Sequence, residues 1–274
     1  MKKLIAITAS IILMVTSAWG TFGSVISSWQ PTNGVRVHSD ASYVYTFYRT
    51  PFPYVSQIIK HTKVGMQVSI INWDCPSTRF VTDTAPCHLG SNYMALSCYQ
   101  KYLYFVDKRD GSIAGSFSIS TINDQPAIAW NGTYYYTVSR TTLYHYTPTG
   151  SRAGYTSTQL PNDIYTQGLA YTTKANGRDG NYLVATRRSV VPPISAYILD
   201  LNQSGSIAAS FWQPGKEYYS ASVGNSSKPL QYGAILWTGS YEGATTWITE
   251  TGIGAEGTSL LTPASLGRVK AIYR

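Results

Sequence analysis

The stretches that decide the fold are Ala127-Ile128-Ala129-Trp130 and Gly168-Leu169-Ala170-Tyr171, in which small and large residues alternate and the last residue is aromatic. Alternation with a period of two is typical of a β-strand. Each stretch is followed, after a short polar turn, by a second strand pattern, Tyr134-Tyr135-Tyr136-Thr137-Val138 and Tyr182-Leu183-Val184-Ala185-Thr186. These pairs predict an inner hairpin that recurs along the chain.

The same pattern occurs at three more places. Met94-Ala95-Leu96-Ser97-Cys98 leads into Tyr102-Leu103-Tyr104-Phe105-Val106, and we predict it as the inner strand of the second repeat. Because this second strand runs almost directly into the turn at Gly111, the second repeat is expected to lack a third strand. Weaker copies begin with Val35-Arg36-Val37-His38 and Ala221-Ser222-Val223. Five repeats therefore account for the chain.

Turn glycines recur once in each repeat, at intervals of 39 to 55 residues: Gly65, Gly111, Gly150, Gly205 and Gly252. A four-stranded β-propeller blade repeats every 40 to 50 residues or so. Small residues on one side of a strand and large ones on the other suit the tapered packing between blades. The sequence predicts an all-β chain that forms a single β-propeller, with five blades of three to four antiparallel strands, and it leaves a six-bladed or irregular ring open.

Either end of the chain could close the ring. Val25-Ile26-Ser27-Ser28-Trp29-Gln30-Pro31 resembles Ala208-Ala209-Ser210-Phe211-Trp212-Gln213-Pro214, which reads as an outer strand. The N-terminal segment is thus a candidate outer strand of the last blade. The ending Gly267-Arg268-Val269-Lys270-Ala271-Ile272-Tyr273-Arg274 is also strand-like and is the competing segment.

The inner-strand motifs Gly168-Leu169-Ala170-Tyr171 and Gly180-Asn181-Tyr182-Leu183 resemble those of secreted bacterial β-propellers of a loosely NHL-like or WD-like kind. The resemblance extends over nearly the whole chain after residue 20 and implies the propeller architecture. These motifs mark architecture rather than activity, so function has to come from the site itself.

Residues 1 to 20 have the three parts of a secretory signal peptide: Lys2 and Lys3, an apolar stretch from Leu4 to Val15, and small residues up to Gly20. We expect cleavage after Gly20, with residues 21–274 as the exported propeller, in the periplasm, at the cell surface or outside the cell. The alternative is an uncleaved anchor helix, for which the apolar stretch is short. No later run approaches the roughly 20 apolar residues of a spanning helix, so we expect no transmembrane span in the mature chain.

Composition narrows the possible partners. Only 12% of residues are charged, against about a quarter in ordinary globular domains. The formal net charge is +8, but export argues against nucleic acid as a partner. The positive charge favours anionic polymers of a cell surface. With 13 aspartates and glutamates in the whole chain, an enzyme that needs many carboxylates is disfavoured.

Three cysteines in an exported chain leave at least one unpaired. We predict a disulfide between Cys75 and Cys87, which flank a polar stretch, and a buried thiol at Cys98, which ends an apolar strand pattern. The rival pairing joins Cys87 to Cys98. No cysteine or histidine spacing indicates zinc, and no cofactor is expected apart from calcium as an alternative.

Polar residues precede several predicted inner strands, at connections that lie around the channel mouth of a propeller. Carboxylates and amides there can accept sugar hydroxyls or coordinate calcium, with nearby tyrosines as apolar faces. The alternative is turn chemistry, because Asn and Asp also bond their own backbone in tight connections. The candidate ligand-binding residues are Asn92, Asp124, Gln125, Asp163, Gln167 and Glu217.

These features favour a non-enzymatic exported propeller that binds a polysaccharide or another surface component. One alternative is a structural or adhesive surface protein that self-associates through its blade edges. The other is a glycoside hydrolase, since five-bladed arabinanase-like and invertase-like enzymes place three carboxylates near the axis. Here His38-Ser39-Asp40-Ala41 stands where those enzymes have Asp-Pro, which disfavours hydrolysis. The carboxylates available to such an enzyme would be Asp40, Asp124, Asp163, Glu217 and Glu242.

Overall fold

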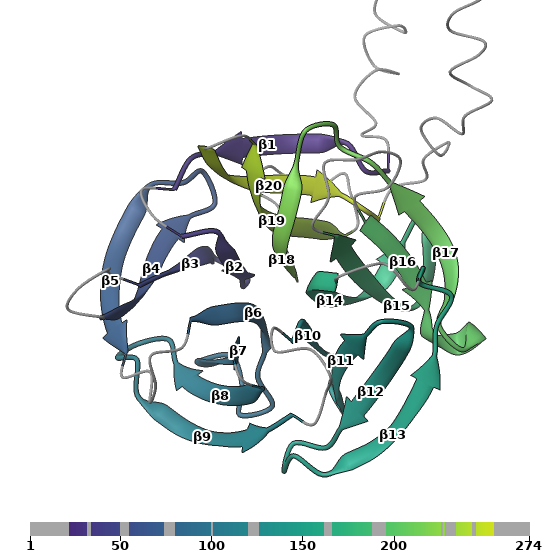
Figure 1. Cartoon of the computed structure of the whole chain (residues 1–274). Helices are drawn as coiled ribbons and strands as arrows, with labels where there is room; N and C mark the ends of the chain where they lie inside the picture. Colours follow the sequence, from purple (N-terminus) through teal and green to yellow (C-terminus); the bar gives the residue numbers. More distant parts are fainter. Residues whose placement is uncertain are drawn as a thin grey trace, which may run out of the picture.

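The chain forms a five-bladed β-propeller, as the sequence predicts (Figure 1). The computed structural model describes residues 22–31, 34–49, 55–73, 80–99, 101–119, 126–161, 166–187, 196–225, 227, 234–242 and 245–254. Within these residues there are twenty strands and one short 3-10 turn, η1 (Leu201–Gln203), and no α-helix. The strands form five four-stranded antiparallel sheets around a central axis, so the ring has five blades rather than six.

Each of the first four blades uses four consecutive strands, ordered from the axis to the rim. The first blade has β2 (Arg36–Ser39), β3 (Tyr43–Arg49), β4 (Ser56–Thr62) and β5 (Gln67–Trp73). The second has β6 (Val81–Pro86), β7 (Tyr93–Cys98), β8 (Tyr102–Asp107) and β9 (Ile113–Ser118). The third has β10 (Ile128–Trp130), β11 (Tyr135–Ser139), β12 (Thr142–Tyr146) and β13 (Arg152–Ser157), and the fourth β14 (Thr166–Ala175), β15 (Arg178–Arg187), β16 (Ala196–Asp200) and β17 (Ser206–Phe211).

The N-terminal strand closes the ring. The fifth blade consists of β18 (Glu217–Gly224), β19 (Ile235–Glu242), β20 (Thr245–Gly252) and, at the rim, β1 (Val25–Trp29). β1 pairs antiparallel with β20, with Ser28 opposite Thr249. The predicted role of the N-terminal segment is confirmed, and the competing segment 267–274 lies outside the described residues.

In the second blade, the predicted inner strand is wrong by one strand. Met94-Ala95-Leu96-Ser97-Cys98 lies in β7, the second strand, and the inner strand is β6. Tyr102-Leu103-Tyr104-Phe105-Val106 lies in β8, so the third strand is present and the blade is complete. The sequence Val-Thr-Asp-Thr-Ala-Pro of β6 lacks the expected alternation because its polar side chains are buried and bonded to other blades.

Four of the predicted turn glycines, Gly65, Gly111, Gly150 and Gly205, have positive φ and lie between a third and an outer strand. The fifth prediction, Gly252, was wrong, because this residue ends β20 and the equivalent turn glycine is Gly23, with φ of 78°. A Cβ at Gly23 would lie 2.6 Å from Cβ of Phe211, at the end of the preceding blade's outer strand.

A separate hydrophobic core lies at each of the five blade interfaces. Alternate residues of one strand serve two cores: Met94 and Leu96 pack toward the first blade, and Ala95 toward the third. Because both faces of most strands are covered, few strand positions suit a charged side chain, and Asp83 and Glu250 are fully buried exceptions. This explains the low charge content of the chain.

Side chains and backbone of different blades are bonded across the axis. Asp83 of β6 is fully buried, and its Oδ2 accepts hydrogen bonds from the backbone N–H of Ile128 (3.0 Å) and Leu169 (2.8 Å). Its Oδ1 accepts from the N–H of Ala221 at 3.4 Å. β14 also approaches β18 so closely that a Cβ at Gly168 would lie 2.4 Å from N of Ala221. One carboxylate thus joins four inner strands.

The predicted Cys75–Cys87 disulfide is not formed. Cys87 carries a reduced thiol, packed in the core between the second and third blades, where the hydroxyl of Tyr135 lies 3.7 Å from its Sγ. The rival Cys87–Cys98 pairing is also absent, and Cys98 is a buried thiol as predicted. Cys75 lies outside the described residues.

Residues 1 to 20, the predicted signal peptide, also fall outside the described part of the chain. Within the part that the structure describes, no helix is long and apolar enough to cross a membrane.

Candidate ligand-binding site

A pocket of about 900 Å³ opens at the end of the ring where the inner strands finish. Its wall comes mainly from the first two blades, with one residue from β10 and the end of β18 from the fifth blade. The polar, charged and aromatic residues of this wall include His38, Ser39, Asp40, Ser42, Tyr43, Tyr45, Lys60, Asn92, Tyr93, Lys108, Arg109, Trp130 and Asn225.

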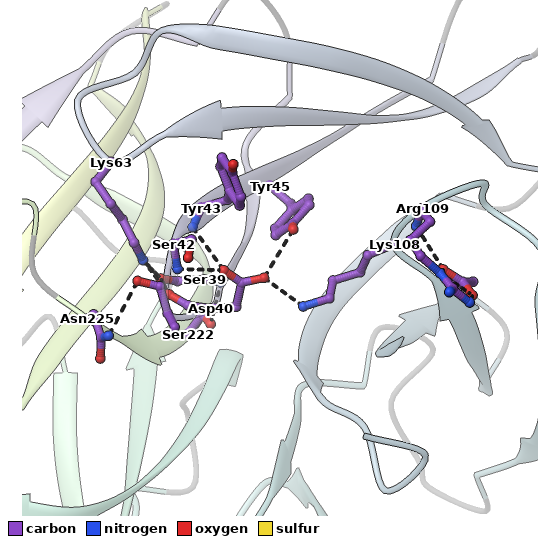
Figure 2. A network of polar contacts seen from close by, with 12 residues as sticks. Ser39, Asp40, Ser42, Tyr43, Tyr45, Lys63, Lys108, Arg109, Ser222 and Asn225 are labelled. Atoms are coloured by element: carbon purple, nitrogen blue, oxygen red, sulfur yellow. Dashed lines mark hydrogen bonds and ion pairs between the residues drawn. The ribbon is translucent and has the colours of Figure 1, made fainter. Parts of the chain in front are cut away.

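Asp40 organises one side of this pocket (Figure 2). It follows β2 directly, and its Oδ1 accepts hydrogen bonds from the N–H groups of Ser42 and Tyr43, both at 2.9 Å, in an Asx turn. Its Oδ2 accepts from the hydroxyl of Tyr45 at 3.0 Å and from Nζ of Lys108 at 2.6 Å. Four donors therefore fix the carboxylate in one position.

Asp40 stays ionised despite its partial burial. Burial alone would raise the pKa of its carboxyl group, but the bond from Lys108 and the two turn N–H groups hold that pKa well below its usual range. The same carboxylate, together with burial, raises the pKa of Tyr45, which remains a neutral donor. Asp40 therefore acts as a fixed anion that positions Lys108 and the turn.

Lys63, in the turn between β4 and β5, joins the first blade to the wall of the pocket. Its Nζ donates to Oγ of Ser39 at 2.5 Å and to the backbone carbonyl of Asp40 at 2.6 Å (Figure 2). Burial lowers the pKa of Lys63 to about 8, partly opposed by the charges of Asp40 and Glu250. Its charge is thus present at neutral pH and is lost in mildly alkaline solution.

His38 supplies an unsatisfied polar atom at the pocket. Its side chain is 2% exposed, and its Nδ1 has no hydrogen-bond partner. Burial lowers the pKa of His38 to about 3, so the ring is neutral at physiological pH. The ring is packed 5.8 Å from that of Tyr45. Because buried polar atoms are nearly always paired, an ordered water is the expected partner of Nδ1.

Cations and aromatic rings complete the wall. Nζ of Lys60 lies 3.7 Å from the centroid of the Tyr43 ring, a cation–π contact. Arg109 is bonded to the carboxylate of Asp107, with its Nη2 2.5 Å from Oδ2. The rings of Tyr43, Tyr93 and Trp130 are partly exposed. The pocket therefore offers flat apolar faces next to positive charge.

The structure separates the predicted site residues. Asn92 lies in the turn between β6 and β7, so it lines the pocket instead of preceding an inner strand as predicted. Gln167 and Glu217 lie at the start of β14 and β18, at the opposite end of the ring, where Glu217 accepts a hydrogen bond from the Tyr219 hydroxyl (3.0 Å). Asp124, Gln125 and Asp163 lie outside the described residues.

The tyrosines expected beside these residues are divided in the same way. Tyr93 lines the pocket, and Tyr218 is fully buried. Tyr165 lies outside the described residues.

The carboxylates considered for hydrolysis do not converge in the described part of the chain. Asp40 follows the end of β2, whereas Glu217 begins β18 and Glu242 ends β19, which places both glutamates at the other end of the ring. Among the described residues, no three His, Cys, Asp or Glu side chains are grouped so that they could hold a metal ion.

Sequence reasoning singled out Asp40 and Asn92 but missed the cations of the pocket wall. Lys108 reads as an ordinary hairpin charge, and nothing local links it to Asp40, 68 residues earlier. Lys63 is similar, because its partners Ser39 and Asp40 lie in another hairpin, whereas Lys60 contacts Tyr43 on the paired strand β3. The one local signal was the Asp-Ala-Ser-Tyr turn after β2, since Asp at this place favours an Asx turn.

Comparison with known proteins supports the fold and nothing finer. No protein-family model and no curated protein matches the chain. Glutaminyl cyclase from Myxococcus xanthus is structurally similar, with a TM-score of 0.56, 10% identity, and coverage of 85% of this chain and 97% of that one. The WD40 propeller domain of Doa1 aligns with a TM-score of 0.46 and 10% identity over 78% of this chain and 62% of that one. At this identity, the likeness to the cyclase shows a shared propeller fold.

Proposed function

We propose that this protein is an exported, non-enzymatic propeller that binds an anionic, hydroxyl-bearing glycan of a cell surface in the 900 Å³ pocket. The observation that carries the proposal is the combination, in one pocket wall, of the cations Lys60, Lys108 and Arg109 with the partly exposed rings of Tyr43, Tyr93 and Trp130.

The other wall groups fit the same kind of ligand. The side-chain amide of Asn92 both donates and accepts hydrogen bonds, which suits hydroxyl groups. The partly exposed rings of Tyr43, Tyr93 and Trp130 offer flat apolar surface to the C–H face of a sugar ring. Concave, partly apolar pockets with a few convergent polar groups are the usual form of small-ligand sites.

The charges favour an anionic ligand. Lys60, Lys108 and Arg109 line the pocket together with a single carboxylate, Asp40. The positive charge of Lys63 lies just behind the wall, bonded to neutral oxygens. This excess of positive charge would attract a carboxylate or sulfate group of an acidic sugar.

The state of Asp40 supports binding rather than hydrolysis. Glycosidases of the two-carboxylate type need one acid with a raised pKa. The pKa of Asp40 is held well below its usual range, and its two oxygens already accept four hydrogen bonds. It is therefore unsuited to donate a proton to a leaving group.

Calorimetric titration with acidic and neutral oligosaccharides tests the proposal. We expect acidic oligosaccharides to bind and Lys60→Ala and Asn92→Ala to weaken that binding roughly tenfold each, the cost of about one polar contact. Lys174→Ala, a lysine of the fourth blade, is the matched control and should leave the affinity unchanged. Equal loss in the control, or unchanged affinity in both pocket variants, would exclude this pocket as the binding site.

A second candidate function is self-association at the rim. The outward side chains of Val68 and Ile70 on the outer strand β5 are 48% and 49% exposed. The strand Gln67–Trp73 carries no charged residue that would discourage pairing with another edge. Light scattering over a range of concentrations tests this idea: assembly should occur in the unaltered protein and be abolished in Ile70→Lys.

A further inference from the structure

Three large apolar side chains project from turns around the pocket. Val64 and Met66, in the turn between β4 and β5, are 71% and 66% exposed. Leu89, in the turn between β6 and β7, is 43% exposed. Turns usually carry polar residues, so exposed aliphatic side chains at two turn tips need an explanation.

Hydrogen bonds and the pocket lining place these tips on its rim. Lys63, next to Val64, donates to Ser39 and to the carbonyl of Asp40 in the pocket wall. Leu89 is followed by Gly90, which lines the pocket. The apolar tips and the cationic pocket therefore belong to the same end of the ring.

The charges around the tips indicate what could cover them. Positive charges outnumber negative ones at the surface here: the cations are Lys60, Lys63, Lys108 and Arg109, the carboxylates are Asp40, Asp107 and Asp110, and Glu250, whose charge acts on Lys63, is fully buried. Asp40 and Asp107 are neutralised by ion pairs with Lys108 and Arg109. A second copy placed on this end would bring like charges together, whereas an anionic surface would be attracted.

We infer that the pocket end of the ring docks on an anionic lipid surface, with Val64, Met66 and Leu89 entering the interfacial region and Lys60 and Arg109, whose side chain is 66% exposed, near the lipid phosphates. Apolar side chains that enter the headgroup region and cations near an anionic leaflet both strengthen peripheral binding. Three side chains are few, so the binding is reversible and depends on both contributions. The inference goes beyond the proposed function and does not require a glycan in the pocket.

Co-sedimentation of the purified exported protein with vesicles tests the inference. We expect binding to vesicles that contain phosphatidylglycerol, and little binding to pure phosphatidylcholine vesicles. The double variant Val64→Ser with Met66→Ser, and separately Leu89→Ser, should bind the anionic vesicles at least about tenfold more weakly. Tyr155→Ser is the matched control, because Tyr155 is 70% exposed on β13 of the third blade, away from the pocket.

Several results would overturn the inference: no binding of the unaltered protein to anionic vesicles, unchanged binding of the tip variants, or an equal loss in Tyr155→Ser. If the tips instead mediate contact between copies, light scattering will show assemblies that the tip variants lose, without vesicle binding. The calorimetric affinity of the tip variants for acidic oligosaccharide is a separate readout. It should stay unchanged, so failure of lipid docking and failure of glycan binding are distinguishable.

Discussion

Replacement of Asp83 by alanine should destabilise the propeller strongly. The carboxylate accepts backbone hydrogen bonds from Ile128, Leu169 and Ala221, which belong to three other blades. Alanine leaves these three buried N–H groups without their acceptor, and each such loss costs about 1 to 3 kcal/mol. Several blades are affected at once, because every one of these groups lies on an inner strand.

Part of this loss is offset. Burial raises the pKa of Asp83 well above its usual value, although the backbone N–H groups oppose that rise. Holding a charge at this place is therefore costly, and alanine removes that cost. Three unpaired N–H groups, less the cost of the buried acid that alanine removes, give an expected net loss of about 3 to 5 kcal/mol. Since a domain has only about 5 to 15 kcal/mol of stability, the variant should be close to unfolding.

Equilibrium unfolding in urea, followed by tryptophan fluorescence, measures this loss, because Trp237 is fully buried in the core between the fifth and first blades. Asp83→Asn retains one acceptor oxygen and should lose about 1 to 3 kcal/mol. Asp179→Ala, an exposed aspartate on β15, is the control and should change stability by less than about 0.5 kcal/mol. A loss below about 1 kcal/mol in Asp83→Ala would refute the role assigned to this carboxylate.

Three further predictions concern ring closure and pH. In urea unfolding, Gly23→Ala should lose about 1 to 3 kcal/mol more stability than Gly132→Ala. Both glycines have positive φ, but only at Gly23 would the new Cβ meet another side chain. Because the pKa of Asp40 is depressed in the folded state, its carboxylate stabilises the fold at pH values above the ordinary aspartate pKa. The unaltered protein should there be about 1 to 2 kcal/mol more stable than Asp40→Asn in thermal unfolding, and this difference should disappear as the pH falls below the ordinary aspartate pKa. Affinity for acidic oligosaccharide should fall as pH rises through about 8, where Lys63 loses its charge, and should persist in Lys63→Arg; an identical pH profile in both proteins would contradict this.

The architecture was readable because propeller strands are covered on both faces. Alternating small and large residues, as in Ala127-Ile128-Ala129-Trp130, reflect packing against two neighbouring blades, and this pattern survives in the sequence. The second blade hid its inner strand because Thr82, Asp83 and Thr84 are polar and buried. Their partners are backbone groups of other blades, which no local pattern can reveal.

The assignment of Met94–Cys98 to the inner strand of the second blade also misplaced one predicted site residue, Asn92. Successive strands of a blade run in opposite directions, so assigning β7 in place of β6 moved the turn at Asn92 to the wrong end of the ring. Gly252 was misassigned for a related reason: the last blade is completed by β1, so its turn glycine, Gly23, lies at the other end of the sequence. The pocket itself depends on contacts between hairpins, such as that between Lys108 and Asp40, which the packing of one blade on the next creates.

The hydrogen bonds across the axis also make the inner strands a rigid support for the pocket. Asp83 joins β6 to β10, β14 and β18, and Ser220 accepts a hydrogen bond from the N–H of Val37 on β2 at 2.8 Å, so all five inner strands are held together. A ligand in the pocket therefore meets a rigid floor that includes His38, next in sequence to Val37. Rigid support lowers the ordering cost of binding and favours a preformed site over one that closes around its ligand. Glu217 and Gln167, at the far end, should accordingly have no part in recognition at the pocket. In the lipid docking that we infer, the end that carries the exposed tips faces the bilayer.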